Sequence, residues 1–268
     1  MTSSIFSMHG RKCLITGASL SIGRAIALGF AEHGADIAVH YAADADKAFG
    51  FPDAAQETVT RIRALGRQAH AVEADLAAPG GPKRAFDGAV AALGQVDVVV
   101  VCASVQMREE FSAISAAELE RQTRINFDAT IELLGVAIPP MRARKWGRVL
   151  TIGSINQTRP EPSLAVYAAL KAAQANLALN LAAQCGRDGV LVNNLAPGLV
   201  ETERNRWRRK DEAEWRDIQK KAAPLLGRAA RPEEMVGAAL LLCSDAGSYI
   251  TGADLPVAGG AQLPGAYN

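Results

Sequence analysis

The sequence predicts an α/β fold, a doubly wound parallel sheet of seven strands with helices on both faces. Short β-rich runs alternate with longer helical patterns along the 268 residues, which indicates strand–helix–strand crossovers and parallel pairing. The run "DVVVVC" is apolar without alternation, as expected of a strand covered on both faces. No repeat or low-complexity linker interrupts the pattern, so we expect a single domain over residues 1–268.

The expected strands follow one another at spacings that leave room for a helix between neighbours. They cover residues 12–16, 36–40, 69–74, 96–102, 148–153, 190–194 and 253–257. The first helical segment, "RAIALGFAEHG", closes on Gly34, a residue suited to a helix C-cap. The stretch "YAADADKAFGFPDAAQ" after the second strand is expected to be a loop-like insertion. The segment "SLAVYAALKAAQANLALNLAAQ" predicts one long helix.

Composition argues against several classes of protein. A net charge of +1 provides no field for nucleic acid or an anionic membrane. The N-terminus lacks the apolar core of a signal peptide and no apolar run approaches membrane-spanning length, so a cytoplasmic location is expected. No CxxC pair and no metal-ligand spacing of histidines occurs, which predicts reduced thiols and no metal site. The cysteines are Cys13, Cys102, Cys185 and Cys243.

The stretch "TGASLSIG" is spaced like a phosphate-binding loop with one glycine replaced. Gly17, Ser21 and Gly23 follow an expected strand and open an expected helix. In such a loop, glycine lets the backbone approach a pyrophosphate, and the helix N-terminus supplies free N–H groups and a positive dipole end. Ser21 either displaces the phosphates slightly or donates its hydroxyl to one of them. A tight turn without a ligand is the alternative.

A second group of polar residues falls at the same edge of the predicted sheet. Tyr167 and Lys171 are four apart and share one helix face. Ser154 ends the strand "RVLTIGS", and open α/β sheets bind their ligands at the carboxyl ends of the strands. Each residue alone has an ordinary interpretation as a surface or turn residue. Together, behind a glycine loop, they indicate a catalytic site.

With these motifs the chain resembles the short-chain dehydrogenase/reductase family, a single-domain Rossmann fold, over about residues 10–260. Within the family it resembles 3-oxoacyl-ACP reductase-like and glucose dehydrogenase-like members. The motifs are "TGASLSIG", "EADL", "RINFDAT", "YAALK", "NNLAPGLVET" and "YITGADLPVAGG". The resemblance implies four catalytic residues, Asn126, Ser154, Tyr167 and Lys171. It implies cofactor contacts from Gly17, Ser19, Ser21, Ile22, Gly23, Tyr41, Asp75, Leu76, Ala103, Tyr167, Lys171, Pro197, Gly198 and Thr202.

The resemblance also implies how the catalytic residues divide the work. Tyr167 exchanges a proton with the substrate oxygen, although a free phenol, with a pKa of about 10, is a poor base at neutral pH. Lys171 and the nicotinamide ring lower that pKa, and Lys171 holds the nicotinamide ribose. Ser154 polarises the substrate oxygen. Asn126 holds a water that links Lys171 to solvent.

The chain departs from the family pattern at three places. Ser21 stands for the middle glycine of the loop. Val101, Cys102, Ala103 and Ser104 stand where the family has NNAG, so that Ser104 replaces a glycine near the cofactor. Ala258 replaces the usual acid of the C-terminal segment. These departures affect the expected pose and affinity of the cofactor more than the chemistry.

The choice of nicotinamide depends on the end of the second strand. NAD-preferring sites place an acid there to bind the ribose 2′-hydroxyl. This chain has His40, Tyr41 and Ala42 instead, and the first acid, Asp44, comes later. The missing acid favours NADP, whereas Leu20 and Ala42 replace cations found in NADP-preferring relatives. NAD therefore stays as the alternative.

The substrate has to be inferred from a charged lid segment near residues 199–227. It carries Trp207 and Trp215, which cover an apolar substrate or pack on the body of the protein. We expect oxidation of a secondary alcohol or reduction of a ketone, with 3-oxoacyl thioesters, small alcohols and sugars as open classes. A catalytically weak nucleotide-binding regulatory protein is the alternative. Nucleic acid is not expected, because acids interrupt the basic run. The small apolar residues of the Tyr167 helix, with the family resemblance, predict a homo-oligomer, a tetramer.

Overall fold

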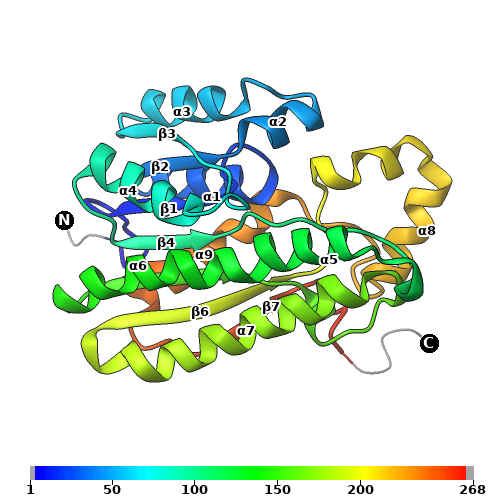
Figure 1. The fold of residues 1–268 in the computed structure, drawn as a ribbon. Coiled ribbons are helices and arrows are strands. Elements are labelled where there is room, and N and C mark those ends of the chain that lie inside the picture. Colours follow the sequence, from blue (N-terminus) through cyan, green and yellow to red (C-terminus); the bar gives the residue numbers. More distant parts are fainter. Residues whose placement is uncertain (1–3, 264–268) are drawn as a thin grey trace.

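The computed structural model describes residues 4–263, and its centre is a seven-stranded parallel sheet (Figure 1). The strand order is β3-β2-β1-β4-β5-β6-β7, so the chain leaves β1 in one direction as far as β3 and then returns past it. Such a reversal creates a crevice at the carboxyl ends of β1 and β4. The strands are β1 Lys12–Ile15, β2 Asp36–Tyr41, β3 Ala69–Glu73, β4 Val98–Val101, β5 Gly147–Ile152, β6 Val190–Pro197 and β7 Asp254–Val257. All seven predicted strands and their parallel pairing are confirmed.

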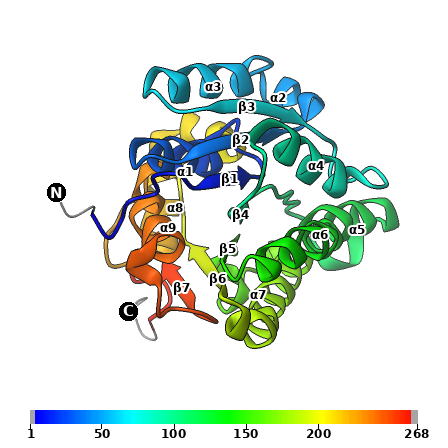
Figure 2. The ribbon, with the colours of Figure 1, turned by 90° about the vertical axis from the view of Figure 1, so that its left-hand side faces the viewer.

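Helices cover both faces of the sheet (Figure 2). On one face α3 and α9 each pack against α1, and on the other α4 packs beside α6, with α7 covering the same face. The helices are α1 Ser21–Glu32, α2 Ala43–Phe49, α3 Ala54–Ala64, α4 Gly81–Leu93, α5 Ala116–Thr123, α6 Ala129–Ala143, α7 Ala165–Cys185, α8 Glu212–Ala222 and α9 Val236–Cys243. The fold is therefore the doubly wound one that the sequence predicts.

Two apolar cores, one on each face, explain why the strands lack alternation. Val98 and Val100 point into the core beneath α1 and α9, whereas Val99 and Val101 point into the core beneath α4, α6 and α7. Each of the four is buried to at least 96% of its surface, with relative exposures of 0–4%. A strand whose two faces both meet helices has no solvent side, and a continuous apolar run is the result.

The insertion after β2 differs from the expectation. Residues 43–49 form the helix α2 instead of a loop. Asp44 and Asp46 stand in its first turn, where carboxylates favour the helix dipole, and Gly50 ends it with a left-handed φ of 87°. Asp46 is buried, with 4% of its surface exposed, and its Oδ1 accepts the Ser19 hydroxyl at 2.8 Å. This long-range contact, invisible in local sequence, anchors the helix.

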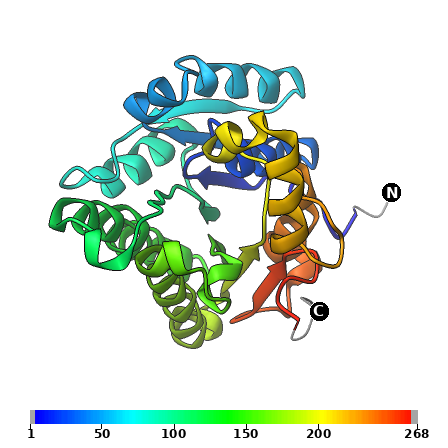
Figure 3. The same cartoon turned by 90° about the vertical axis from the view of Figure 1, so that its right-hand side faces the viewer.

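The lid segment (residues 199–227) contains a 3₁₀ helix, η6 Glu203–Lys210, followed by α8. Figure 3 shows it in yellow, near the carboxyl ends of the strands. Trp215 on α8 is buried, whereas Trp207 exposes 62% of its surface. Of the two sequence interpretations, packing on the protein body therefore holds for Trp215. Within residues 4–263, no helix combines the length and apolar character that a membrane crossing requires.

Candidate active site

Ser154 and Tyr167 meet at the carboxyl end of β5. Ser154 follows β5, where its Oγ accepts the Asn156 backbone N–H at 3.2 Å, and Tyr167 lies two residues into α7. The Tyr167 hydroxyl hydrogen-bonds the Ser154 side chain. Tyr167 exposes 6% of its surface and Ser154 9%. The structure thus brings these two predicted catalytic residues into direct contact.

Lys171 lies one helical turn further along α7 and exposes only 1% of its surface. Its Nζ donates to the Ile152 carbonyl oxygen at 2.7 Å and to Gln174 Oε1 at 3.0 Å. Burial lowers the pKa of Lys171 to about 7. The ammonium is 5.9 Å from the centroid of the Tyr167 ring. The Ile152 carbonyl of β5 therefore holds the Lys171 ammonium at the carboxyl end of the sheet, on the same side as Tyr167.

Asn126 occupies a π-helical turn, η2 Arg124–Asp128, between α5 and α6. Its side chain exchanges two hydrogen bonds with the backbone of Val105, donating Nδ2–H at 2.9 Å and accepting N–H at 3.0 Å. Its carbonyl oxygen accepts Gln174 Nε2–H at 3.5 Å. The Asn126 side chain thus holds the loop after β4 in place. Its backbone carbonyl oxygen, and not its side-chain amide, contacts Gln174, the partner of Lys171.

Gln174 is a residue that sequence reasoning missed. It is fully buried and joins Lys171 to Asn126, with a further bond from its Nε2 to Thr130 Oγ1 at 2.9 Å. The sequence contained one usable signal, because Gln174 lies three residues after Lys171 on the same helix face. Gln174 thus links Lys171 to the backbone of Asn126, and the water that the family resemblance implies at Asn126 stays a prediction.

Arg204 of η6 is the second residue that sequence reasoning missed. Its Nη2 donates to the Ser104 carbonyl oxygen at 2.7 Å and to Ser104 Oγ at 2.9 Å. It also hydrogen-bonds the Tyr167 side chain. Burial raises the pKa of Tyr167, whereas the Arg204 charge and the hydrogen bonds from Ser154 and Arg204 lower it. The cation that acts on Tyr167 here comes from the lid segment.

The glycine loop lies against the end of β4. Gly17 has a φ of 64°, and a Cβ on it would lie 3.1 Å from the Ala103 Cα. Thr16 Oγ1 accepts the backbone N–H groups of Cys102 and Ala103 at 2.9 and 3.0 Å. A Cβ on Gly23 would meet the Gly17 carbonyl oxygen at 2.1 Å. Both glycines are required for the close approach of loop, strand and helix.

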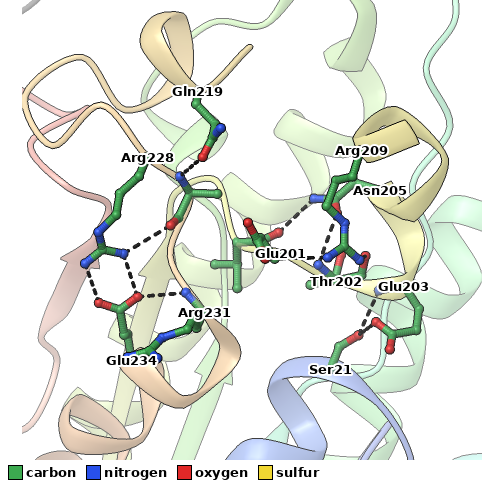
Figure 4. Close-up of polar contacts among 12 residues, drawn as sticks. Ser21, Glu201, Thr202, Glu203, Asn205, Arg209, Gln219, Arg228, Arg231 and Glu234 are labelled. Carbon is green, nitrogen blue, oxygen red and sulfur yellow. Dashed lines mark hydrogen bonds and ion pairs between the residues drawn. The ribbon is translucent and has the colours of Figure 1, made fainter. Parts of the chain in front are cut away.

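The N-terminus of α1 fits the phosphates of a dinucleotide. Leu20 at the N-cap makes no side-chain hydrogen bond, and the first turn carries no acid. Its N–H groups and positive dipole end are therefore available to an anion. Ile22 lies in this turn. Ser21, with a left-handed φ of 52°, instead directs its hydroxyl to Glu203 of the lid segment (Figure 4).

His40 supports the loop from β2. Its Nδ1 accepts the Gly17 N–H at 3.2 Å, so its Nε2 carries the proton and donates to the Ala74 carbonyl oxygen at 3.1 Å. Burial lowers its pKa to about 4. Neutral His40 is thus part of the glycine loop's framework, a role that the sequence did not suggest.

Two acids lie near the expected adenosine end of the site. Asp46 accepts the Ser19 hydroxyl at Oδ1, and among residues 4–263 its Oδ2 has no hydrogen-bond partner. Burial raises the pKa of Asp46, against the Ser19 hydrogen bond and the Arg24 charge. Tyr41 ends β2 and donates its hydroxyl to Glu73 Oε2 at 3.2 Å. Asp46, from the insertion, is an acid that sequence reasoning did not place here.

The other expected cofactor residues lie at the same carboxyl edge of the sheet. Asp75 and Leu76 follow β3, with Asp75 Oδ1 accepting the Ala77 N–H at 2.8 Å. Pro197 ends β6, and a Cβ on Gly198 would lie 2.8 Å from the Ala258 Cα. Thr202 is the N-cap of η6. The strands bring these residues to one edge, and whether they contact a nucleotide stays a prediction.

A cavity of about 370 Å³ lies between α1 and the lid segment (Figure 4). Its charged lining comes from Arg24, Arg61, Glu201, Glu203, Arg209, Arg231 and Glu233. The four residues predicted to be catalytic do not line it, and its cations and carboxylates largely compensate one another. We therefore place substrate chemistry at the strand ends and not in this cavity.

Comparison with known proteins agrees with this geometry. A family model described as "Enoyl-(Acyl carrier protein) reductase" matches residues 17–262. An L-rhamnose 1-dehydrogenase (NAD(P)(+)) of Sphingomonas sp. is 34% identical over 254 residues, 94% of this chain and 96% of the relative. This chain belongs to the short-chain dehydrogenase/reductase family. It shares the family's NAD(P)-dependent oxidoreductase class.

Solved structures of short-chain dehydrogenase/reductases overlay closely on this member. A 3-oxoacyl (acyl-carrier-protein) reductase from Agrobacterium tumefaciens C58 with NADP bound has a TM-score of 0.88 and 41% identity, covering 97% of each chain. A gluconate 5-dehydrogenase from Burkholderia cenocepacia J2315 in complex with NADP and tartrate has a TM-score of 0.87 and 31% identity, covering 97% of this chain and 98% of the other.

Proposed function

We propose that this short-chain dehydrogenase/reductase catalyses NADP-dependent interconversion of a ketone and a secondary alcohol. When bound, NADPH would supply the hydride to the carbonyl carbon and leave as NADP⁺, and Tyr167 would give the proton to the oxygen. The observation that carries the proposal is the contact of Tyr167 with Ser154, one turn from buried Lys171. Positioned proton donors beside a carbonyl are what this reaction requires of the protein.

The chain's own groups account for the proton and the orientation. Tyr167 donates a proton to the substrate oxygen, and Ser154 hydrogen-bonds that oxygen. Lys171 resupplies the proton to Tyr167, and burial, which lowers the pKa of Lys171 to about 7, favours release of that proton. Gln174 and the Ile152 carbonyl hold the lysine in place. Asn126 keeps the loop after β4 in position.

NADP is the proposed cofactor, with NAD as the alternative. His40, Tyr41 and Ala42 leave the end of β2 without a carboxylate to repel a 2′-phosphate. Solved relatives from Agrobacterium tumefaciens and Burkholderia cenocepacia were crystallised with NADP. Asp46 is the one feature on this side that favours NAD, and its carboxylate is occupied by Ser19 on one oxygen.

The relatives indicate several candidate substrate classes and do not decide among them. They include 3-oxoacyl thioester, sugar, sugar-acid and hydroxysteroid enzymes. Trp207 is exposed and Trp215 is packed away, so neither tryptophan supports a site built for a large apolar substrate. A small polar oxo compound or a 3-oxoacyl thioester fits the charged lid segment better.

A screen of reduced-nicotinamide absorbance tests the proposal. NADP(H) and NAD(H) are each combined with ketones, secondary alcohols, sugars, sugar acids and 3-oxoacyl thioesters. We expect turnover with one class and a higher kcat/KM with NADP. Cofactor binding without turnover of any substrate would instead support the regulatory alternative, for which the comparisons provide no support.

A homotetramer in the cytoplasm completes the proposal, with residues 1–268 as one domain. The outer faces of α6 and α7 expose Ile131 and Leu179 to 45% and 54%, apolar surface that a second subunit would cover. The four cysteines are free thiols, as a reducing compartment favours. Light scattering coupled to size-exclusion chromatography measures the oligomeric state. A monomer would contradict this part of the proposal.

A further inference from the structure

Arg204 belongs to the lid segment but lies beside Tyr167. Its guanidinium hydrogen-bonds the Tyr167 side chain and binds Ser104 through two bonds of 2.7 and 2.9 Å. Because Tyr167 is the proposed proton donor to the substrate oxygen, its contact with Arg204 puts the guanidinium beside the proposed reaction site. In many enzymes a lid segment closes over the bound substrate, and the lid's side chains then border the reaction site.

The Arg204 charge acts on a second basic group, because it contributes with burial to lowering the pKa of Lys171. Among residues 4–263 no carboxylate forms an ion pair with Arg204, whereas its neighbour Arg209 pairs with Glu201 at 3.5 Å. The charged and titratable groups that face it are Lys171, Tyr167 and Cys102. Burial raises the pKa of the Cys102 thiol to about 11, so this thiol is neutral at physiological pH. A partly buried guanidinium without a counter-ion favours the binding of an anion.

Ser104 explains how the guanidinium is held. The family pattern has glycine at this position, which offers no side chain. Here the Ser104 hydroxyl and carbonyl both accept from Nη2 of Arg204, so one edge of the planar group is fixed. The guanidinium has five N–H donors, and those not bound by Ser104 remain for Tyr167 and for a carboxylate.

We propose that Arg204 selects substrates with a carboxylate one or two carbons from the carbon that exchanges hydride. These are 2- and 3-hydroxy acids and the corresponding oxo acids. The short distance between carboxylate and reacting carbon follows from the contact of Arg204 with Tyr167. Arg204 can bind the carboxylate while Tyr167 binds the reacting oxygen only if these two substrate groups lie close together. The inference rests on the proposed function, because it assumes that Tyr167 protonates the substrate.

Matched acid and ester substrates test the inference. The kcat/KM with NADPH is measured for 2-oxobutanoate and 3-oxobutanoate and for their methyl esters. We expect the wild-type protein to prefer at least one acid over its ester by about tenfold or more. Arg204→Met should reduce this preference by about tenfold or more, mainly through KM, and Arg204→Lys should retain part of it. Arg206→Met, an exposed arginine of the same helix, is the matched control and should leave the preference unchanged.

The ratio of acid to ester separates substrate selection from an effect on Tyr167. A changed Tyr167 pKa alters turnover of acid and ester alike, and the ratio cancels it. Equal use of acid and ester by the wild type, or an unchanged ratio in Arg204→Met, overturns the inference.

Binding distinguishes failure of the inference from failure of the proposed function. Calorimetry measures 3-oxobutanoate and 2-oxobutanoate binding to protein saturated with NADP⁺, in which reduction cannot occur. If the wild type binds either acid and Arg204→Met does not, the anion site is supported. If, in addition, no substrate turns over, only the proposed function fails. No binding of either acid to the wild type at millimolar concentration overturns the inference.

Discussion

The Ser21 hydroxyl and Glu203 form a two-way contact between the glycine loop and the lid segment. Ser21 Oγ donates to Glu203 Oε2 at 3.3 Å and accepts the Glu203 backbone N–H, also at 3.3 Å (Figure 4). The residue that replaces the family's middle glycine is thus tied to the lid beside the N-terminus of α1. The contact places a carboxylate next to the helix end where a dinucleotide's phosphates would bind.

Replacing Ser21 by glycine should leave nicotinamide binding equal or make it tighter, by up to about tenfold. Glycine adopts the φ of 52° without strain, and the substitution frees Glu203 to move away from the phosphates. Calorimetry with NADP⁺, NADPH, NAD⁺ and NADH measures the dissociation constants. Glu203→Gln should change the affinity in the same direction. Glu212→Gln, at an exposed residue of α8, should change the affinity little. A large loss of affinity in Ser21→Gly would show that the hydroxyl holds a phosphate.

Tyr167→Phe should keep the fold and most of the cofactor affinity yet reduce kcat by about 10²- to 10⁴-fold, the size expected for a lost general acid. Lys171→Ala should lower kcat and also weaken cofactor binding, because Lys171 is expected to hold the nicotinamide ribose. Steady-state kinetics on a substrate found in the screen, with calorimetry of the cofactor, checks both. Full activity of Tyr167→Phe would refute the catalytic assignment.

His40 should make the folded state sensitive to acid. Its pKa is about 4 in the fold, below the ordinary value of 6.5, so the unfolded chain binds more protons between these values. Stability is therefore complete above about pH 6.5 and declines as the pH falls towards 4, by about 2–3 kcal/mol from this group. Urea unfolding at several pH values measures the decline. His40→Asn, which cannot titrate, should show a shallower pH dependence, and an identical slope in both proteins would contradict this role.

Tyr41→Asp should shift the NADP/NAD ratio of kcat/KM towards NAD by at least about tenfold. An aspartate there accepts a bond from the 2′-hydroxyl of NAD and repels the 2′-phosphate of NADP. Two unit charges about 4 Å apart interact by about 4 kcal/mol at an effective dielectric of about 20, and salt reduces this to about 1–2 kcal/mol. The wild type should favour NADP. If the ratio does not move, residue 41 does not face the ribose.

Asp46→Asn should move the same ratio in the opposite direction, towards NADP, by about threefold to tenfold. The substitution keeps a side chain that can accept the Ser19 hydroxyl but removes the buried negative charge. Asp44→Asn, on the exposed side of α2, is the matched control. A wild type that prefers NAD by about tenfold, together with loss of that preference in Asp46→Asn, would mean that the insertion supplies the acid missing from β2.

Local pattern was sufficient for the sheet, and together with the family resemblance it supplied the residues predicted to be catalytic. Each strand is a short apolar run closed by turn residues, and Tyr167 and Lys171 share a helix face by their spacing alone. The observed strand ends differ from the predicted ones where pairing with a neighbouring strand determines where a strand stops. β6, for instance, continues to Pro197 because β7 pairs with it from Asn194 onward.

What the sequence determined by itself is therefore the fold and the residues expected at its catalytic edge, since periodicity and short motifs are local properties. The tertiary structure alone decided which side chains from distant segments complete that edge. Arg204 reaches Ser104 across 100 positions, Glu203 reaches Ser21 across 182, and Asp46 reaches Ser19 across 27. Contacts of this kind depend on where the lid segment and α2 pack, and no local period or spacing encodes that packing.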